Sequence, residues 1–299
     1  MKRIFYNNNK ELRNIWKIIF IFVFFNMISL TSAVAAGVIY QNVNIKSFPE
    51  MISETMNHDL GYDLAILIMC GLIYLFYRYI LKKEKRSWID LGLSREHRFL
   101  KILQGFAFGA IFVAVYISIL ILMKQVEFEM RPLTSSAAYS LLNGLLIFSG
   151  VAFAEETTFR GYFQYLLGKK NKYAGMVLSA VIFALYHLVN ADNYTIASLI
   201  YLTLGGILLG IIRLSANNIW FPIGFHIAWN WMEIRVFGLN NISDHHWLST
   251  KIVHNTIWNG GEGGSGLVLI LLQVAFIFGF GYFYSRKRGE TKLLFTRSQ

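Results

Sequence analysis

The sequence predicts an all-α, polytopic membrane helix bundle with about eight transmembrane helices and both termini in the cytoplasm. Of its 299 residues, 55% are hydrophobic and only 15% are charged, whereas ordinary soluble domains carry about 25% charge. The chain has three prolines, the residue that most often breaks a helix. It also contains about eight apolar stretches of the length that crosses a bilayer. These observations exclude a water-soluble enzyme.

The predicted spans each have roughly the 17 to 25 residues needed to cross a hydrocarbon core of about 30 Å. No internal repeat or low-complexity linker separates them, so we expect residues 1–299 to form a single membrane domain. Apolar residues interspersed with charges at 87–101 predict a helix lying at the membrane interface. The eight spans are expected at about residues 18–40, 64–81, 102–123, 138–163, 174–189, 196–212, 219–238 and 266–284.

The basic residues are sorted by side of the membrane. If the spans alternate in direction, 23 of the 28 Lys and Arg residues lie on the side of the two termini, and five lie on the other. This bias predicts that both termini are cytoplasmic. It also explains the net charge of +11 through topology and contacts with lipid headgroups. We therefore expect the lipid bilayer as a partner and no nucleic acid.

The first span permits two interpretations. Its basic tail, apolar run and Ala33-Val34-Ala35 sequence resemble a cleavable signal peptide. The apolar run of 23 residues is long for a signal peptide, which favours an uncleaved anchor. Either alternative leaves the other spans in the same orientation.

The fourth span ends in charged residues. A charge inside a span costs about 2.5–3.5 kcal/mol, which indicates that these residues have a structural or catalytic role. Glu155 and Glu156 are adjacent, so they point about 100° apart on a helix. Arg160 lies four residues after Glu156, a spacing that favours an ion pair. We expect Glu156 to be the structural partner of Arg160 and Glu155 to be available for chemistry. The alternative is a purely structural cluster, although buried ion pairs are poor stabilisers.

Two histidines and one amide lie in other spans. His187 lies in the fifth span, and His226 and Asn230 lie one turn apart in the seventh. Each histidine alone has an alternative role as a hydrogen-bonded packing residue. Glu155 and His187 are about equally far from the turn that joins their spans, which predicts that they lie at the same depth. His226 reaches this depth only if the polar boundary of that hairpin lies near residues 161–165.

Three spaced motifs carry a resemblance to a known family. Glu155-Glu156-x-x-x-Arg160, Phe183-x-x-x-His187 and His226-x-x-x-Asn230 occur in this order, each in its own span. Together they resemble the signature of the CPBP family, also called type II CAAX prenyl proteases or ABI proteins, which are multi-helix intramembrane endopeptidases. The resemblance implies a catalytic core at about residues 135–285.

The resemblance also implies roles for the motif residues. Peptide hydrolysis needs an activated water, a base and donors that face the developing oxyanion. By this resemblance, Glu155 and His187 bind and activate the water. His226 and Asn230 donate hydrogen bonds to the oxyanion. Glu156 and Arg160 brace the first motif.

The need for a metal stays open at the level of sequence. The family is often labelled as metalloprotease, which would make His187, His226 and Glu155 ligands of zinc. A site of two histidines, one glutamate and a water is chemically adequate for zinc. The chain has no HExxH motif, and its lone Cys70 excludes a cysteine-based zinc site. We favour a metal-free glutamate mechanism, with zinc as the alternative cofactor.

The substrate is expected to be a peptide or the C-terminal segment of a protein. Eukaryotic relatives remove the last three residues from prenylated CaaX proteins, whereas prokaryotic relatives are linked to bacteriocin self-immunity, peptide-signal processing or scaffolding. The chain is rich in Ile, Asn, Lys and Phe, a composition typical of low-GC bacteria. We therefore expect a bacterial cell membrane and a short hydrophobic or membrane-bound peptide that enters from the cytoplasmic side.

Two other classes of function compete with a protease. A non-catalytic immunity or scaffold protein of the same fold would bind a partner, but binding alone needs no base beside two imidazoles. A proton-coupled transporter would use the same acids and histidines as a relay. The sequence shows no inverted repeat, which is typical of many transporters.

Overall fold

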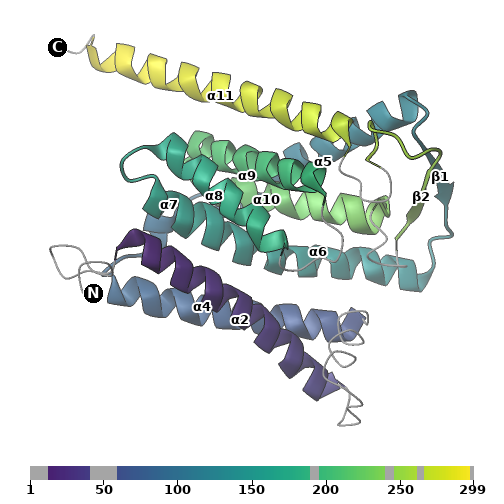
Figure 1. Cartoon of the computed structure of the whole chain (residues 1–299), viewed down its shortest axis with the longest axis horizontal. Coiled ribbons are helices and arrows are strands. Elements are labelled where there is room, and N and C mark those ends of the chain that lie inside the picture. The colour runs from purple at the N-terminus through teal and green to yellow at the C-terminus, as the bar shows by residue number, and fades with distance from the viewer. Residues whose placement is uncertain (1–12, 41–58, 189–194, 240–245, 261–265, 297–299) are drawn as a thin grey trace. The chain divides into compact units, whose positions relative to one another are not determined.

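The computed structural model describes residues 13–40, 59–188, 195–239, 246–260 and 266–296 (Figure 1). Almost all of the regular structure in these residues is helical, which confirms the predicted all-α membrane bundle. The contacts divide the chain into two compact units. Residues 1–88 and 153–155 form the first, and residues 89–152 and 156–299 form the second.

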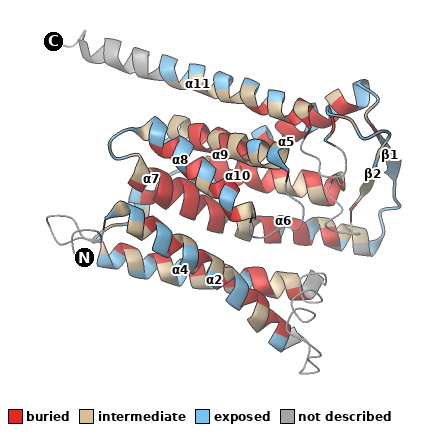
Figure 2. Cartoon of the chain, in the orientation of Figure 1, coloured by how far each residue is buried: buried red, intermediate tan, exposed pale blue. Residues whose placement is uncertain are grey.

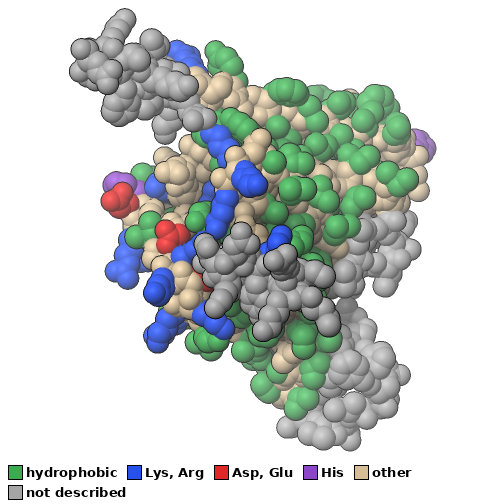
Figure 3. Space-filling view, turned by 60° about the vertical axis from the view of Figure 1, so that its left-hand side comes forward, with side chains coloured by type: hydrophobic (Ala, Val, Ile, Leu, Met, Phe, Trp, Pro, Cys, Tyr) green, Lys and Arg blue, Asp and Glu red, His purple; other side chains and the backbone are tan. Residues whose placement is uncertain are grey.

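Within the described residues, six helices are long and apolar enough to cross a membrane. They correspond to six of the eight expected spans, and many of their apolar side chains are exposed, as suits contact with lipid. Figure 3 shows such hydrophobic side chains over broad parts of the surface. The six run over Asn14–Ile39, Gly61–Lys83, Arg98–Leu122, Ala137–Leu167, Ile196–Ala216 and Leu267–Arg286.

The other two expected spans have different forms. The fifth is α8 (Lys172–Leu188), whose 17 residues are at the lower limit for crossing a bilayer. The seventh is divided into α10 (Trp220–Asn230) and the π-helix η3 (Trp231–Val236). The π-helix holds the buried charged residues Glu233 and Arg235, which end the apolar stretch. The seventh span is therefore not one continuous α-helix.

Residues 87–101, where the sequence predicts an interfacial helix, do not form one continuous helix. The segment holds a short 3-10 turn, η1 (Trp88–Leu91), and α5 begins only at Arg98. Gly92 and His97 have φ angles of 88° and 50°. Such left-handed backbone conformations interrupt a helix. The backbone at these two residues therefore divides the segment.

The first unit is built around two antiparallel helices, α2 (Asn14–Tyr40) and α4 (Asp59–Lys83). Lys17 near the start of α2 pairs with Glu84 just after α4 over 2.5 Å. The rings of Phe24 and Phe76 stack with centroids 4.5 Å apart. These two pairs, about two turns apart on α2, help to hold the helices together.

The second unit holds the remaining elements. Contacts place α10 beside α5, α8 beside α9, and α9 beside α11, around a core that includes Phe112, Phe225 and Trp229. The π-helix η2 and α10 are buried almost throughout (Figure 2). The other helices and strands of the chain, in order, are α5 (Arg98–Leu122), β1 (Val126–Met130), α6 (Ser135–Glu156), η2 (Thr157–Phe163), α7 (Gln164–Leu167), α9 (Ile196–Ala216), β2 (Leu248–Ile252) and α11 (Leu267–Thr296).

Side-chain caps set where two of these helices begin. The Asn171 carboxamide oxygen accepts hydrogen bonds from the backbone N–H groups of Tyr173 and Ala174, at 3.0 and 3.2 Å. The Thr195 hydroxyl accepts from the N–H of Ser198 at 3.1 Å. Asn and Thr are favoured at this position because they satisfy N–H groups that lack a partner within the helix. The starts of α8 and α9 are thereby fixed.

Strands β1 and β2 pair antiparallel, with Val126 opposite Ile252 and Met130 opposite Leu248. Across this ribbon the Lys251 ammonium donates to Glu129 over 2.6 Å. This hydrogen bond and the attraction between the charges lower the pKa of the Glu129 carboxyl and raise the pKa of Lys251. Both groups are exposed, so the pair adds little to stability.

Helices α5 and α10 meet backbone to backbone at glycines. A Cβ atom on Gly105 would lie 2.0 Å from the carbonyl oxygen of Phe221, and one on Gly224 would lie 2.0 Å from that of Ile102. Gly109 is similarly close to the backbone of Phe225. Small residues allow such close approach between membrane helices. This contact fixes the position of α10 against α5.

We expect Gly105→Ala to destabilise the protein by about 1–3 kcal/mol, because the added methyl group would force α5 away from α10. The thermal unfolding midpoint of the purified protein in detergent measures this effect. Gly279→Ala is the matched control, since a Cβ at Gly279 in α11 meets no atom within 4 Å. Equal midpoints for the two variants would contradict the close contact.

Candidate active site

A buried ion pair forms where α6 passes into η2. Nη1 of Arg160 donates to Oε1 of Glu156 over 2.9 Å, and the two side chains are 1% and 0% exposed. This confirms the pair expected from the spacing of four residues. Because an unpaired charge is costly in a lipid-embedded bundle, each of these residues makes the burial of the other tolerable.

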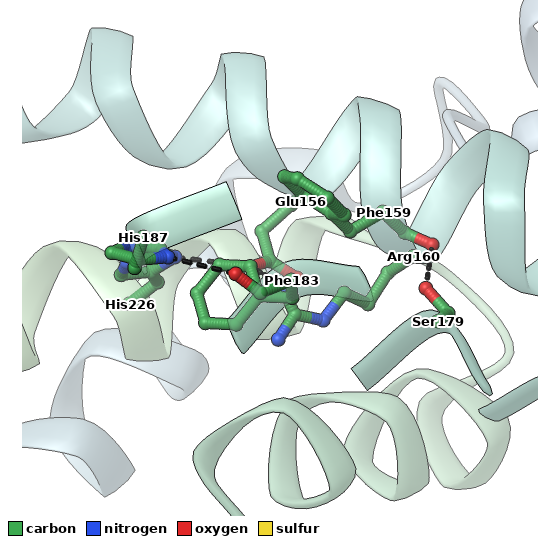
Figure 4. Close-up of polar contacts among 7 residues, drawn as sticks. All are labelled: Glu156, Phe159, Arg160, Ser179, Phe183, His187 and His226. Atoms are coloured by element: carbon green, nitrogen blue, oxygen red, sulfur yellow. Dashed lines mark hydrogen bonds and ion pairs between the residues drawn. The ribbon is translucent and has the colours of Figure 1, made fainter. Parts of the chain in front are cut away.

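The same carboxylate oxygen also contacts His226. Nδ1 of His226 lies 3.0 Å from Oε1 of Glu156, although the two residues are 70 positions apart in the chain (Figure 4). A carboxylate has no proton to offer, so Nδ1 is the donor and the tautomer carries its proton there. Glu156 thereby joins the end of α6 to α10, and His226 reaches the depth of Glu156.

The ring of Phe183, on α8, lies close to Arg160 and to both histidines. It lies 4.2 Å from the guanidinium carbon of Arg160, within the range of a cation–π contact. Its centroid is 4.5 Å from that of the His187 ring and 6.3 Å from that of the His226 ring. Figure 4 shows this ring beside both histidines and the arginine.

His187 is oriented by its own helix. Its Nδ1 atom lies 2.9 Å from the carbonyl oxygen of Phe183, one turn earlier. Because a carbonyl only accepts, Nδ1 carries the proton and donates it. In the neutral ring, Nε2 then keeps its lone pair. Such a partner at one nitrogen fixes the tautomer that the other nitrogen presents.

Backbone groups around Arg160 are also tied to α8. The Ser179 hydroxyl donates to the carbonyl oxygen of Phe159 over 2.6 Å (Figure 4). One turn further, the side-chain amide of Gln164 donates to the carbonyl oxygen of Gly210 on α9 over 3.1 Å. Sequence reasoning missed Ser179 and Gln164. Their only signal was a polar residue within or beside an apolar stretch.

The structure thus brings Glu156, Arg160, His187 and His226 into one cluster around Phe183. Glu155 precedes Glu156 in α6 and is 6% exposed, and it belongs to the other compact unit. Asn230 is the last residue of α10 and is half-buried. Among the described residues, Asn230 has no hydrogen bond to the cluster.

The described His, Cys, Asp and Glu side chains bear on whether this site could hold a metal. Within the described residues, no three His, Cys, Asp or Glu side chains are grouped so that they could hold a metal ion.

Comparison with known protein families finds one match. Residues 137–232 match the family described as type II CAAX prenyl endopeptidase Rce1-like. This segment contains all three motifs and about a third of the chain. No curated protein and no solved structure matches the chain. The match supports the CPBP family, the type II CAAX prenyl endopeptidases, over residues 137–232, and the six long apolar helices support a multi-pass integral membrane protein.

Proposed function

We propose that this protein is an intramembrane endopeptidase that hydrolyses a peptide bond with a water activated by glutamate and histidine. The observation that carries the proposal is the double use of Glu156, whose Oε1 accepts from Arg160 and from His226. This contact unites the first and third motifs, and Phe183 adds the second. Three separate helices thus supply one polar cluster within an apolar bundle.

In this proposal Glu155 is the general base. Oε1 of Glu156 already accepts from Arg160 and His226, so we assign the role of base to the neighbouring carboxylate, as the resemblance to the family implies. Glu155 removes a proton from the water, and the hydroxide attacks the carbonyl carbon of the substrate. The C–N bond then breaks, and the proton passes to the departing amine. His187, whose Nδ1 is fixed on the Phe183 carbonyl, uses Nε2 to orient the water.

His226 and Asn230 are assigned to the oxyanion. With Nδ1 donating to Glu156, His226 offers Nε2 to the substrate. Nε2 donates a hydrogen bond only when the ring is doubly protonated, and the Glu156 carboxylate stabilises that cation. The amide of Asn230, one turn later on α10, supplies the second donor. One such donor is worth about 2.7–4 kcal/mol in other hydrolases.

The proposed substrate is the C-terminal segment of a protein or a short hydrophobic peptide at the cytoplasmic side of the membrane. The family assignment supports a peptide substrate. Two internally quenched reporter peptides separate the alternatives when incubated with the purified protein in vesicles. One carries a farnesylated cysteine in a C-terminal Cys-aliphatic-aliphatic-X segment, and the other is hydrophobic and carries no prenyl group. We expect cleavage of the second.

Glu155→Ala and His187→Ala should each lower peptide release by about 10²–10⁴-fold, because each removes a group that acts on the water. Mass spectrometry of peptides released by cells, compared with wild type at equal protein levels, measures the effect. Glu127→Ala and His254→Ala, which alter residues in β1 and near β2, are the matched controls. Unchanged release and phenotype in both test variants would instead support the non-catalytic immunity or scaffold protein.

Glu156→Gln should destabilise the protein by about 3–5 kcal/mol and reduce cleavage, because Arg160 and His226 would lose their shared negative partner. Chemical unfolding in detergent measures the stability. Glu129→Gln breaks an exposed ion pair and should leave the midpoint unchanged. If the two variants unfold alike, Glu156 does not have the bracing role.

Dialysis against a chelator should leave the cleavage rate unchanged, since the described donor groups do not form a three-ligand site. Elemental analysis of the active protein should find less than one metal ion per chain. Loss of activity that returns on addition of Zn²⁺ would overturn the metal-free mechanism.

A further inference from the structure

Arg160 lies in the middle of a rare backbone conformation. The π-helix η2 (Thr157–Phe163) interrupts the helical run between α6 and α7, and all seven of its residues are buried. In a π-helix, hydrogen bonds join residues five apart, and the Gln164 N–H accordingly donates to the carbonyl oxygen of Phe159. Such turns are uncommon and occur frequently at functional sites. They need support from their surroundings to persist.

Ser179 provides support from a neighbouring helix. Its hydroxyl donates to the same Phe159 carbonyl over 2.6 Å, across 20 residues of sequence, and Ser179 is 2% exposed. A serine in a helix usually donates to the carbonyl four residues earlier in its own helix. Among the described residues, the serines that do so, over 2.6 to 3.1 Å, include Ser29, Ser32, Ser118 and Ser149. Ser179 instead donates to η2.

Ser179, Phe183 and His187 are four residues apart on α8 and so share one face of that helix. Each makes a contact within the candidate site. Ser179 binds the carbonyl that directly precedes Arg160, and the Phe183 ring covers the guanidinium of Arg160 at 4.2 Å. His187 donates to the Phe183 carbonyl. Arg160 is therefore held by α8 at its backbone and at its side chain.

We propose that Ser179 is a positioning residue that fixes the π-helical turn and thereby sets Arg160 against Glu156 Oε1, which in turn orients His226. It acts through the backbone of η2 and touches no substrate. Its effect on turnover rests on the proposed peptidase function, whereas its effect on η2 and on His226 does not.

The test compares Ser179→Ala with Ser149→Ala. Both remove a hydroxyl that donates to a carbonyl over 2.6 Å within an apolar helix, but Ser149 donates to Leu145 in its own helix. With the reporter peptide that the wild type cleaves, Ser179→Ala should lower kcat by about tenfold and leave KM within about twofold. A tenfold change corresponds to about 1.4 kcal/mol, within the range for one hydrogen bond. Ser149→Ala should leave both constants unchanged.

Two measurements that need no activity accompany the kinetics. Hydrogen exchange of the segment 157–167 should become faster in Ser179→Ala alone. The Nδ1 signal of ¹⁵N-labelled His226 should shift in Ser179→Ala and not in Ser149→Ala. If the wild type cleaves neither reporter, the peptidase proposal fails while these measurements still test the role of Ser179.

The proposal is overturned if Ser179→Ala matches Ser149→Ala in exchange and in the His226 signal. It is also overturned if the lower activity of Ser179→Ala only follows a lower fraction of folded protein, with kcat per folded molecule unchanged. Thermal unfolding midpoints of both variants, measured on the same samples, give the folded fractions.

Discussion

One carboxylate oxygen, Oε1 of Glu156, determines the arrangement of the candidate site. Its two donors come from different parts of the chain, Arg160 from the next helical turn and His226 from α10. A lone arginine would be costly inside a lipid-embedded bundle, and so would a lone glutamate. The two can be buried only together, and the imidazole of His226 completes the set. Charge compensation thus fixes how the end of α6 meets α10.

Contacts of Phe183 join α8, the fifth expected span, to the pair of Glu156 and Arg160. The Phe183 ring lies on the guanidinium of Arg160, and the Phe183 carbonyl binds Nδ1 of His187. One residue therefore links the arginine to the second histidine by its side chain and its main chain. Its exposed fraction is 5%, so water does not compete for either contact.

The parts of the fold and site that depend on local spacing could be predicted from the sequence. Apolar length gave the six long helices, and a spacing of four residues gave the pair of Glu156 and Arg160. The resemblance of the ordered motifs to the CPBP family agrees with the match over residues 137–232. These features depend on composition and helical geometry within one segment of chain.

The remaining features depend on long-range packing, which a single sequence does not reveal. The sequence left the depth of His226 open, because it depends on where α10 lies against α6. The π-helices η2 and η3 have no reliable sequence signal, since residue types of η2 such as Phe, Gly, Tyr and Arg also occur in the α-helix α5. The break at Gly92 and His97 depends on left-handed backbone angles that the charge pattern of residues 87–101 does not reveal.

The glycine contact between α5 and α10 has a consequence for engineering. His226 is on α10, but the helix against which α10 lies is α5, which ends before the family-matched segment begins at residue 137. An excised fragment of residues 137–232 would keep all three motifs and lose the surface that seats one of them. A minimal version of this protein must therefore start upstream of Arg98.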